Sequence, residues 1–404
     1  MSGIKFAGND YLGLANDPRL AEAMYKAARE YGVSATSGRY FLGWTDVHQQ
    51  LEKSLATFFG TDSACLIPAA YLGGLLYFTT MADKHKTVFC DEMSHSNLFL
   101  GMRAAGMQIR RYRHLDPRDL GKQLSLCFDG PPPIVCTDAI FGISGEVAPL
   151  DEIAAVSGRF RAELFIDDAH GVFALGDKGR GSAEAFGLDM KEVTVLGSMS
   201  KALGAGTGFF VGRADLLEKL QRASTGSSPP PIPIAAACLE ALRIVASEPA
   251  LRKRMWQNAK RMREILVAHG ITVVSDGTPI VAMSLKDETE ARQLEQHFEA
   301  NGILIRYAKY PSEPRENLLR AAARACHTEE DLQRFEQAVA GFFRKSAARP
   351  AKPAAKHAKA ASKPAAKSTA KPAKARKAAA KKPVVKAKKK AKTGARDSKR
   401  RKTK

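Results

Sequence analysis

Long apolar runs and paired cysteines are both missing from this chain of 404 residues. No run approaches the ~20 apolar residues that a membrane-spanning helix needs, and the first residues lack the apolar region of a signal peptide. The six cysteines show no CxxC or other paired spacing, which argues against a zinc site or a disulfide framework. We therefore expect a soluble, cytoplasmic protein with reduced cysteines that pack in its interior, no metal and no membrane span.

Acidic residues are almost absent from the C-terminal end. Residues 345–404 hold 24 lysines and arginines, one acid (Asp397) and no aromatic residue. The other 39 basic and 41 acidic residues lie in 1–344, so the net charge of +21 belongs to the C-terminal segment. Such a Lys/Ala/Pro-rich segment cannot bury enough apolar surface to offset the entropy of ordering. We predict that 346–404 is disordered and binds nucleic acid without sequence preference; the alternative is a solvated tail that aids solubility.

Short β-branched runs alternate with helical periodicity through the first half of the chain. We predict strands at 64–67, 87–90, 134–137, 164–166, 193–196 and 209–211. Helical stretches at 73–82 and 150–162 lie between them, after helices at 18–31 and 49–59. This alternation predicts an α/β fold with a mostly parallel central sheet covered by helices on both faces.

The sequence divides into four segments. Residues 1–50 form an N-terminal segment, and 51–233 form a large domain. A long helical region at about 234–269 then leads into a smaller α+β domain that ends near residue 345. This domain is predicted to contain strands at 272–274, 280–285 and 303–307 and helices at 288–301 and 329–343. The basic tail occupies 346–404.

Two predicted strands end in polar residues. Asp167 and His170 follow the strand at 164–166, and Lys201 follows the strand at 193–196. Open α/β sheets bind ligands at such carboxyl ends. A lone lysine just past a buried strand is poorly hydrated, so it can lose its proton near neutrality and form a Schiff base with an aldehyde. Because an acid keeps a pyridine nitrogen protonated and the ring an electron sink, Asp167 and Lys201 together predict a site for pyridoxal phosphate (PLP). The large domain at 51–233 is therefore the one that we expect to bind PLP.

Further motifs occur in order over residues 9–344. They are 9–15, 38–39, 94–96, 145–150, 167–171, 179–181, 200–204 and 327–328. On these motifs the chain resembles the α-oxoamine synthase family of fold-type-I PLP enzymes, which includes 8-amino-7-oxononanoate synthase and glycine C-acetyltransferase. The basic tail resembles the tails of lysine-rich linker histones.

The resemblance implies a homodimeric acyltransferase. It would condense a small amino acid with an acyl-CoA, usually with decarboxylation, to give an α-aminoketone. One alternative is another fold-type-I PLP enzyme, such as an aminotransferase, which would consume a 2-oxo acid and release no CoA. The other is a nucleic-acid-associated protein that acts through its basic tail.

The resemblance also implies roles for individual residues. Lys201 would carry the cofactor and remove the Cα proton, Asp167 would pair with the pyridine nitrogen, and His170 would hydrogen-bond the phenolic oxygen. His95 would stack on the ring and assist acyl transfer, and Arg320 would hold the amino-acid carboxylate through two parallel hydrogen bonds. The remaining cofactor contacts are implied for Tyr71, Leu72, Ser198 and, from the neighbouring subunit, Ser227.

The chain departs from the family in two cofactor contacts. The phosphate loop at 69–74 keeps Tyr71 but lacks the usual serine and asparagine, so backbone N–H groups at a helix start would carry more of the phosphate binding. The segment 138–142 lacks a hydroxyl that the family places near the phenolic oxygen. We interpret the chain as a divergent member of the family.

Overall fold

The structure is a computed structural model that describes residues 3–126, 130–307, 309 and 313–347. The predicted disorder and nucleic-acid binding of 346–404 fall almost wholly outside these residues. The described residues form one compact unit. The division of that unit at residues 50 and 233 stays a prediction.

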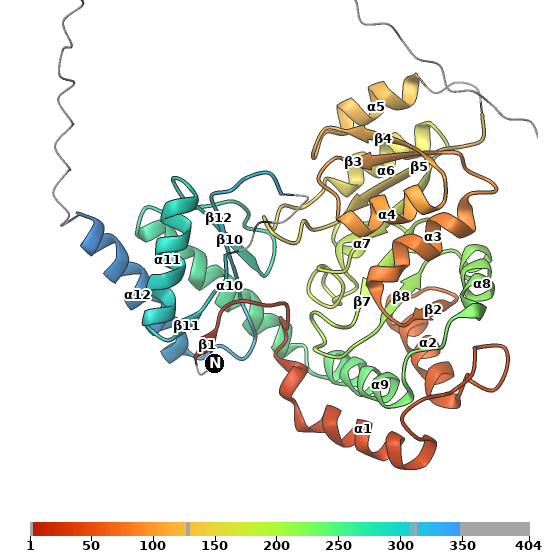
Figure 1. Cartoon of the computed structure of the whole chain (residues 1–404), viewed down its shortest axis with the longest axis horizontal. Coiled ribbons are helices and arrows are strands. Elements are labelled where there is room, and N and C mark those ends of the chain that lie inside the picture. Colours follow the sequence, from red (N-terminus) through yellow and green to blue (C-terminus); the bar gives the residue numbers. More distant parts are fainter. Residues whose placement is uncertain (1–2, 127–129, 308, 310–312, 348–404) are drawn as a thin grey trace, which may run out of the picture. The chain divides into compact units, whose positions relative to one another are not determined.

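A seven-stranded sheet forms the centre of the fold (Figure 1). Its order is β2-β8-β7-β6-β5-β3-β4. Strand β8 runs antiparallel to both of its neighbours, and the other pairs are parallel. The strands are β2 (Ala64–Ile67), β3 (Thr87–Asp91), β4 (Gln108–Tyr112), β5 (Ile134–Asp138), β6 (Glu163–Asp167), β7 (Thr194–Ser198) and β8 (Gly208–Val211). The predicted fold, with a mostly parallel central sheet, is confirmed.

Successive residues of each strand point to opposite faces of the sheet, and both faces are covered. Phe165 and Leu196 pack in one hydrophobic cluster, whose helices are α3 (Gly73–Met81), α4 (Ser96–Ala104) and α8 (Ala214–Ala223). Ile166 and Val195 pack in the opposite cluster. Its helices include α1 (Pro18–Tyr31), α2 (Asp46–Phe59), α5 (Pro117–Ser125), α6 (Leu150–Arg159), the short α7 (Ser182–Ala185) and α9 (Ile232–Ser247). Buried on both sides, these strands read as continuous apolar runs in the sequence.

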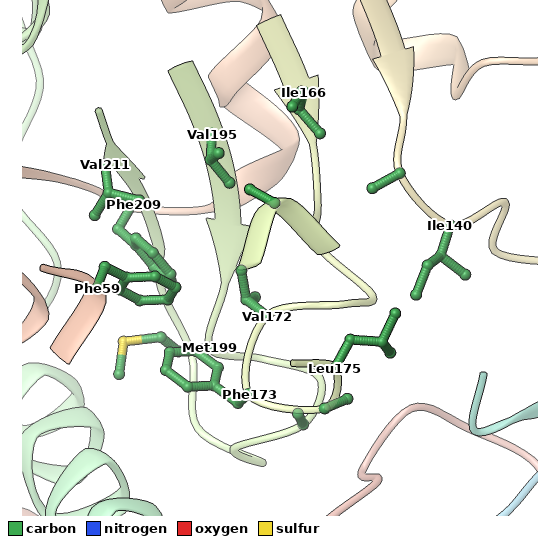
Figure 2. Packing of buried hydrophobic residues seen from close by; sticks show 14 of the residues in the cluster. Phe59, Ile140, Ile166, Val172, Phe173, Leu175, Val195, Met199, Phe209 and Val211 are labelled. Atoms are coloured by element: carbon green, nitrogen blue, oxygen red, sulfur yellow. The ribbon is translucent and has the colours of Figure 1, made fainter. Parts of the chain in front are cut away.

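The second cluster also anchors the segments that leave β6 and β7, as Figure 2 shows. Val172 and Phe173, just after β6, and Met199, just after β7, are fully buried. Phe173 contacts the rings of Phe59 and Phe209, with centroids 5.6 and 5.8 Å away. Burying one such side chain stabilises the fold by about 1.5–3 kcal/mol. Residues next to these anchors are therefore held in fixed positions.

The two clusters on the faces of the central sheet form the first core, and a second core lies in the C-terminal part of the unit. Strands β9 (Thr272–Val273), β10 (Ile280–Ser284) and β12 (Leu318–Ala322) form an antiparallel sheet of order β12-β10-β9. Strand β1 (Ile4–Lys5) pairs in parallel with β11 (Ile303–Leu304). The helices are α10 (Ala250–Ala268), α11 (Glu288–Ala300) and α12 (Glu329–Ala347). The α+β character expected for this region is present.

The structure corrects two details of the sequence interpretation. The helical region at 234–269 is two helices, because Pro249 disfavours helical geometry at Glu248, whose φ is −120° and ψ 65°. Cys326 is exposed, whereas the other described cysteines, Cys65, Cys90, Cys136 and Cys238, are buried. Within the described residues, no helix is long and apolar enough to cross a membrane.

Candidate active site

Two adjoining cavities, of about 380 and 270 Å³, lie beyond the carboxyl ends of β6 and β7. Both are lined by His95, Asp138, Gly142, His170 and Lys201. The register places the ends of β5, β6 and β7 side by side, which brings residues far apart in sequence to one edge.

Each cavity is also lined by residues that do not line the other. The larger one is also lined by Tyr71, Asp167 and Ser198. The smaller one is also lined by Arg320 and Glu313. Most of the residues predicted for the site, which are spread between Tyr71 and Arg320 in the sequence, thus line two cavities that share a wall.

Lys201 is a partly buried lysine near two buried carboxyls, those of Asp138 and Asp167. Burial lowers its pKa to about 8, against the opposing effect of Asp167 and Asp138. Burial also raises the pKa of Asp167, while the charge of Lys201 and a hydrogen bond from the Ala169 N–H (3.1 Å) lower it. The pKa of Asp138 is raised well above its usual value, by burial first and by Asp167 second. The burial and the neighbouring charge thus favour the protonated form of Asp138 most, whereas Lys201 and the Ala169 N–H favour the ionised form of Asp167.

The pKa of Lys201 has a consequence for cofactor uptake. Only the neutral amine attacks an aldehyde, and below the pKa its fraction rises about tenfold per pH unit. We expect the rate of PLP uptake by the apoprotein to rise in this way up to about pH 8 and to level off above it. The measurement is the growth of cofactor absorbance after mixing, with Lys201→Ala as the blank. A rate that stays flat between about pH 6 and pH 8 would contradict this view of Lys201.

His170 is a neutral imidazole held by a buried tyrosine. Its Nδ1 lies 2.7 Å from the hydroxyl of Tyr11. Burial lowers the pKa of His170 well below its usual value, and the charges of Lys201 and Arg320 lower it further. The ring therefore presents one N–H and one lone pair at neutral pH.

Arg320, on β12, reaches the same cavity from the second core. Its Nε donates to the carbonyl of Gly142 (2.6 Å), and its Nη atoms donate to the Gly8 carbonyl (3.1 Å) and the Asn9 side-chain oxygen (2.7 Å). These neutral acceptors orient the guanidinium without neutralising it.

The two nearby arginines behave differently. Arg315 pairs with the carboxylates of Glu146 and Glu313, and Arg324 pairs with Asp10. Within the part of the chain that the structure describes, Arg320 has no carboxylate partner. It is therefore the arginine of this group that can hold a substrate carboxylate.

His95 caps the start of α4, with its Nδ1 2.6 Å from the Asn97 side-chain oxygen. Its backbone N–H donates to the carboxyl of Asp138 (3.2 Å). Its ring meets the ring of Tyr71 edge to face, with centroids 6.3 Å apart. His95 and Tyr71 thus border the larger cavity together.

The hydroxyls predicted for phosphate binding lie in different places. Ser198 Oγ is 2.8 Å from Ser200 Oγ, and both residues line the larger cavity. Ser227 is exposed, bonds the Ser228 carbonyl and lines neither cavity. Leu72 does not line them either, and its N–H donates to the Ala69 carbonyl (3.0 Å) within the 3-10 turn Ala70–Leu72. The described site therefore holds Ser198 but not Ser227 or Leu72.

The structure brings to the site several residues for which the sequence predicts no role. Asn9 and Tyr11 belong to the motif at 9–15, but nothing in the sequence connects them to Arg320 or His170. Asp138 could have been found, because it ends β5 beside the end of β6. Ser200 lies beside Lys201 and was noted only as part of its motif.

Comparison with known proteins identifies this site. Residues 2–339 match the family of class I and II aminotransferases, and the chain belongs to this family. It is 33% identical over 345 residues to 8-amino-7-oxononanoate synthase of Symbiobacterium thermophilum, covering 84% of this chain and 87% of the relative. It is 35% identical over 350 residues to that of Chromohalobacter salexigens, covering 85% and 90%.

Solved structures agree with these relatives. Serine palmitoyltransferase from S. paucimobilis, with a bound PLP–myriocin aldimine, is similar with a TM-score of 0.81 and 27% identity, over 85% of this chain and 88% of that one. The 8-amino-7-oxononanoate synthase of Francisella tularensis is similar with a TM-score of 0.72 and 25% identity, over 86% and 98%. The resemblance to the α-oxoamine synthases is confirmed.

The cofactor of the chain is PLP, and the larger cavity fits it. The amine of Lys201 with its lowered pKa, the carboxyl of Asp167 and the hydroxyls of Ser198 and Ser200 line that cavity. These are the groups that an aldehyde, a pyridinium and a phosphate require. The chain is a PLP-dependent acyltransferase of the α-oxoamine synthase type.

Proposed function

We propose that the site condenses a small amino acid with an acyl-CoA, usually with loss of CO₂, and releases an α-aminoketone. The observation that carries this proposal is the position of Arg320. It lines the smaller cavity without a carboxylate partner among the described residues, and that cavity shares Lys201 and His170 with the larger one. A carboxylate held by Arg320 would place the amino acid beside Lys201.

Each residue then has a defined task. Bound PLP supplies an electron sink for the negative charge that forms at Cα. Asp167 keeps the ring nitrogen protonated through its negative charge, and Lys201 takes the Cα proton on its amine. Arg320 orients the carboxylate through its positive charge and through the one Nη1–H that its bonds to the described residues leave over. This fixed geometry lowers the entropic cost of the reaction.

The acyl transfer step would use the two histidines. The neutral His170 can donate a hydrogen bond to oxygen charge in the larger cavity, because burial keeps it uncharged. His95 borders both cavities, so it can stack on the cofactor ring and reach the acyl carbonyl on the substrate side. Met93, Phe141 and Ile143 give the smaller cavity apolar walls for the first carbons of the acyl chain.

The test separates this reaction from transamination. The holoenzyme is given an amino acid labelled with ¹³C in its carboxyl group, with and without acyl-CoA. We expect labelled CO₂ and an aminoketone only when acyl-CoA is present. A labelled 2-oxo acid formed without any release of CoA would favour the aminotransferase alternative.

We also propose that the enzyme is a homodimer in which Ser227 reaches the phosphate site of the partner subunit. Ser227 lines neither cavity of its own chain. Residues 40–42 carry three apolar side chains that are 54%, 75% and 91% exposed, a surface suited to a second copy. A monomeric protein with full activity would contradict this proposal.

The basic tail has a separate proposed role, which its charge supports. The 24 cationic residues of 345–404 would bind polyphosphate chains by releasing counterions, with a steep dependence on salt. We expect deletion of 346–404 to leave turnover unchanged and to abolish retention on DNA at low salt. Loss of turnover on truncation would contradict the proposal that the tail takes no part in catalysis.

The cytoplasmic location stays a prediction from the sequence.

A further inference from the structure

The buried hydroxyl of Tyr11 contacts both His170 and Arg320. Tyr11 is 0% exposed, and its oxygen lies 2.7 Å from His170 Nδ1, 3.2 Å from Arg320 Nη2 and 3.4 Å from the Asn9 side-chain oxygen. Burial raises the pKa of Tyr11 to about 12, although Arg320 opposes this effect. The hydroxyl therefore keeps its proton at neutral pH.

The direction of these hydrogen bonds follows from the groups involved. Arg320 has only N–H donors, so Tyr11 accepts from it. The single phenolic proton can go to His170 Nδ1 or to Asn9, whose oxygen already accepts a 2.7 Å bond from Arg320. The contact of the hydroxyl to His170 Nδ1 (2.7 Å) is shorter than its contact to the Asn9 oxygen (3.4 Å). Tyr11 thus donates to Nδ1, and the proton of the neutral imidazole lies on Nε2.

His170 Nε2 lies next to Gly142, a residue without a side chain. A Cβ atom at Gly142 would lie 2.6 Å from Nε2, and both residues line the two cavities. In the described part of the chain, Nε2 has no hydrogen-bond partner. Its N–H is therefore available to an oxygen atom bound in the cavity.

We propose that Tyr11 is a positioning residue: its hydroxyl holds His170 with the proton on Nε2 and ties that ring to the arginine that orients the substrate carboxylate. This inference rests on the proposed function, because it assigns Arg320 and His170 the tasks given above. Tyr11 itself lines neither cavity, so it acts through its two partners.

Loss of the hydroxyl would act on both partners. His170 would lose a hydrogen bond to its neutral form, and such a bond lowers the pKa of an imidazole. The pKa of His170 would therefore rise, restrained by burial and by the charges of Lys201, Arg320 and His95 that face it. Arg320 would keep its bonds to Gly142, Gly8 and Asn9, so substrate binding would weaken less than turnover.

The test compares Tyr11→Phe with Tyr77→Phe in the holoenzyme. Tyr77 is also 0% exposed, but its hydroxyl has no hydrogen-bond partner among the residues that the structure describes, so this variant controls for loss of a buried hydroxyl. For Tyr11→Phe we expect kcat to fall about tenfold or more, with a smaller rise in KM for the amino acid. The acid limb of the kcat/KM profile should move toward neutral pH. Tyr77→Phe should keep the wild-type profile.

A ¹⁵N spectrum of histidine-labelled holoenzyme gives a readout independent of turnover, with His170→Gln used to assign the signals. The wild-type spectrum should show Nε2 protonated and Nδ1 as an acceptor, and Tyr11→Phe should change the Nδ1 signal. A Tyr11→Phe enzyme with the wild-type acid limb and an unchanged Nδ1 signal would overturn the inference. If the wild type releases no CoA, the proposed function fails, and the spectrum still decides the role of Tyr11.

Discussion

Replacing Lys201 with alanine is expected to lower the rate of CoA release by about 10⁴-fold or more. The variant would lose the amine that attacks the cofactor aldehyde and also the base that takes the Cα proton. No other lysine lines either cavity, so no described residue can replace it. The measurement is amino-acid-dependent thiol release by the purified variant in the presence of PLP.

The matched control for this variant is Lys178→Ala. Lys178 is exposed on the segment after β6, where only its backbone N–H makes a described contact, to Glu184. This control should keep wild-type turnover and the wild-type cofactor absorbance. Activity in Lys201→Ala within tenfold of the control would mean that another residue carries the chemistry.

Replacing Asp167 with asparagine is expected to lower turnover by about 10²–10³-fold, because removing one preorganised electrostatic contact to developing charge costs that much. Without the carboxylate the ring nitrogen loses the charge that keeps it protonated. Asp167 also raises the pKa of Lys201, so that pKa should fall below about 8 in the variant. The measurements are exchange of the Cα proton of the amino acid into D₂O without acyl-CoA, and the pH profile of PLP uptake.

The neighbouring carboxylate provides the control. Asp168 is fully buried and accepts hydrogen bonds from the N–H (2.7 Å) and hydroxyl (2.6 Å) of Ser182, away from both cavities. Asp168→Asn should therefore lower stability by about 1–3 kcal/mol and retain proton exchange. If the two variants lose proton exchange equally, the assigned role of Asp167 is wrong.

The strands and their functional ends could be predicted from the sequence because the sheet is buried on both faces. Val195 and Leu196 precede Lys201, and Ile166 precedes Asp167, in short apolar runs that are typical of strands buried on both faces. Strand β4 was missed, because it lies at the sheet edge and its residues, such as Arg110 and Arg111, lack apolar alternation.

The contacts that join the two cores could not be predicted. Tyr11 and Arg320 are 309 positions apart, and only the folded chain brings their side chains to 3.2 Å. Strand β12, which positions Arg320, was also missed, although the resemblance to the family identified the arginine. Ser227 and Leu72 were assigned to the cofactor by the same resemblance, and the structure places both outside the cavity linings, so their roles stay predictions.

The most direct test of the central claim is thiol release by the holoenzyme over a grid of amino acids and acyl-CoA lengths. We predict release that requires one small amino acid together with an acyl-CoA and that disappears in Lys201→Ala. Absence of release for every pair, in a protein that shows the absorbance of bound PLP, would contradict the acyltransferase account.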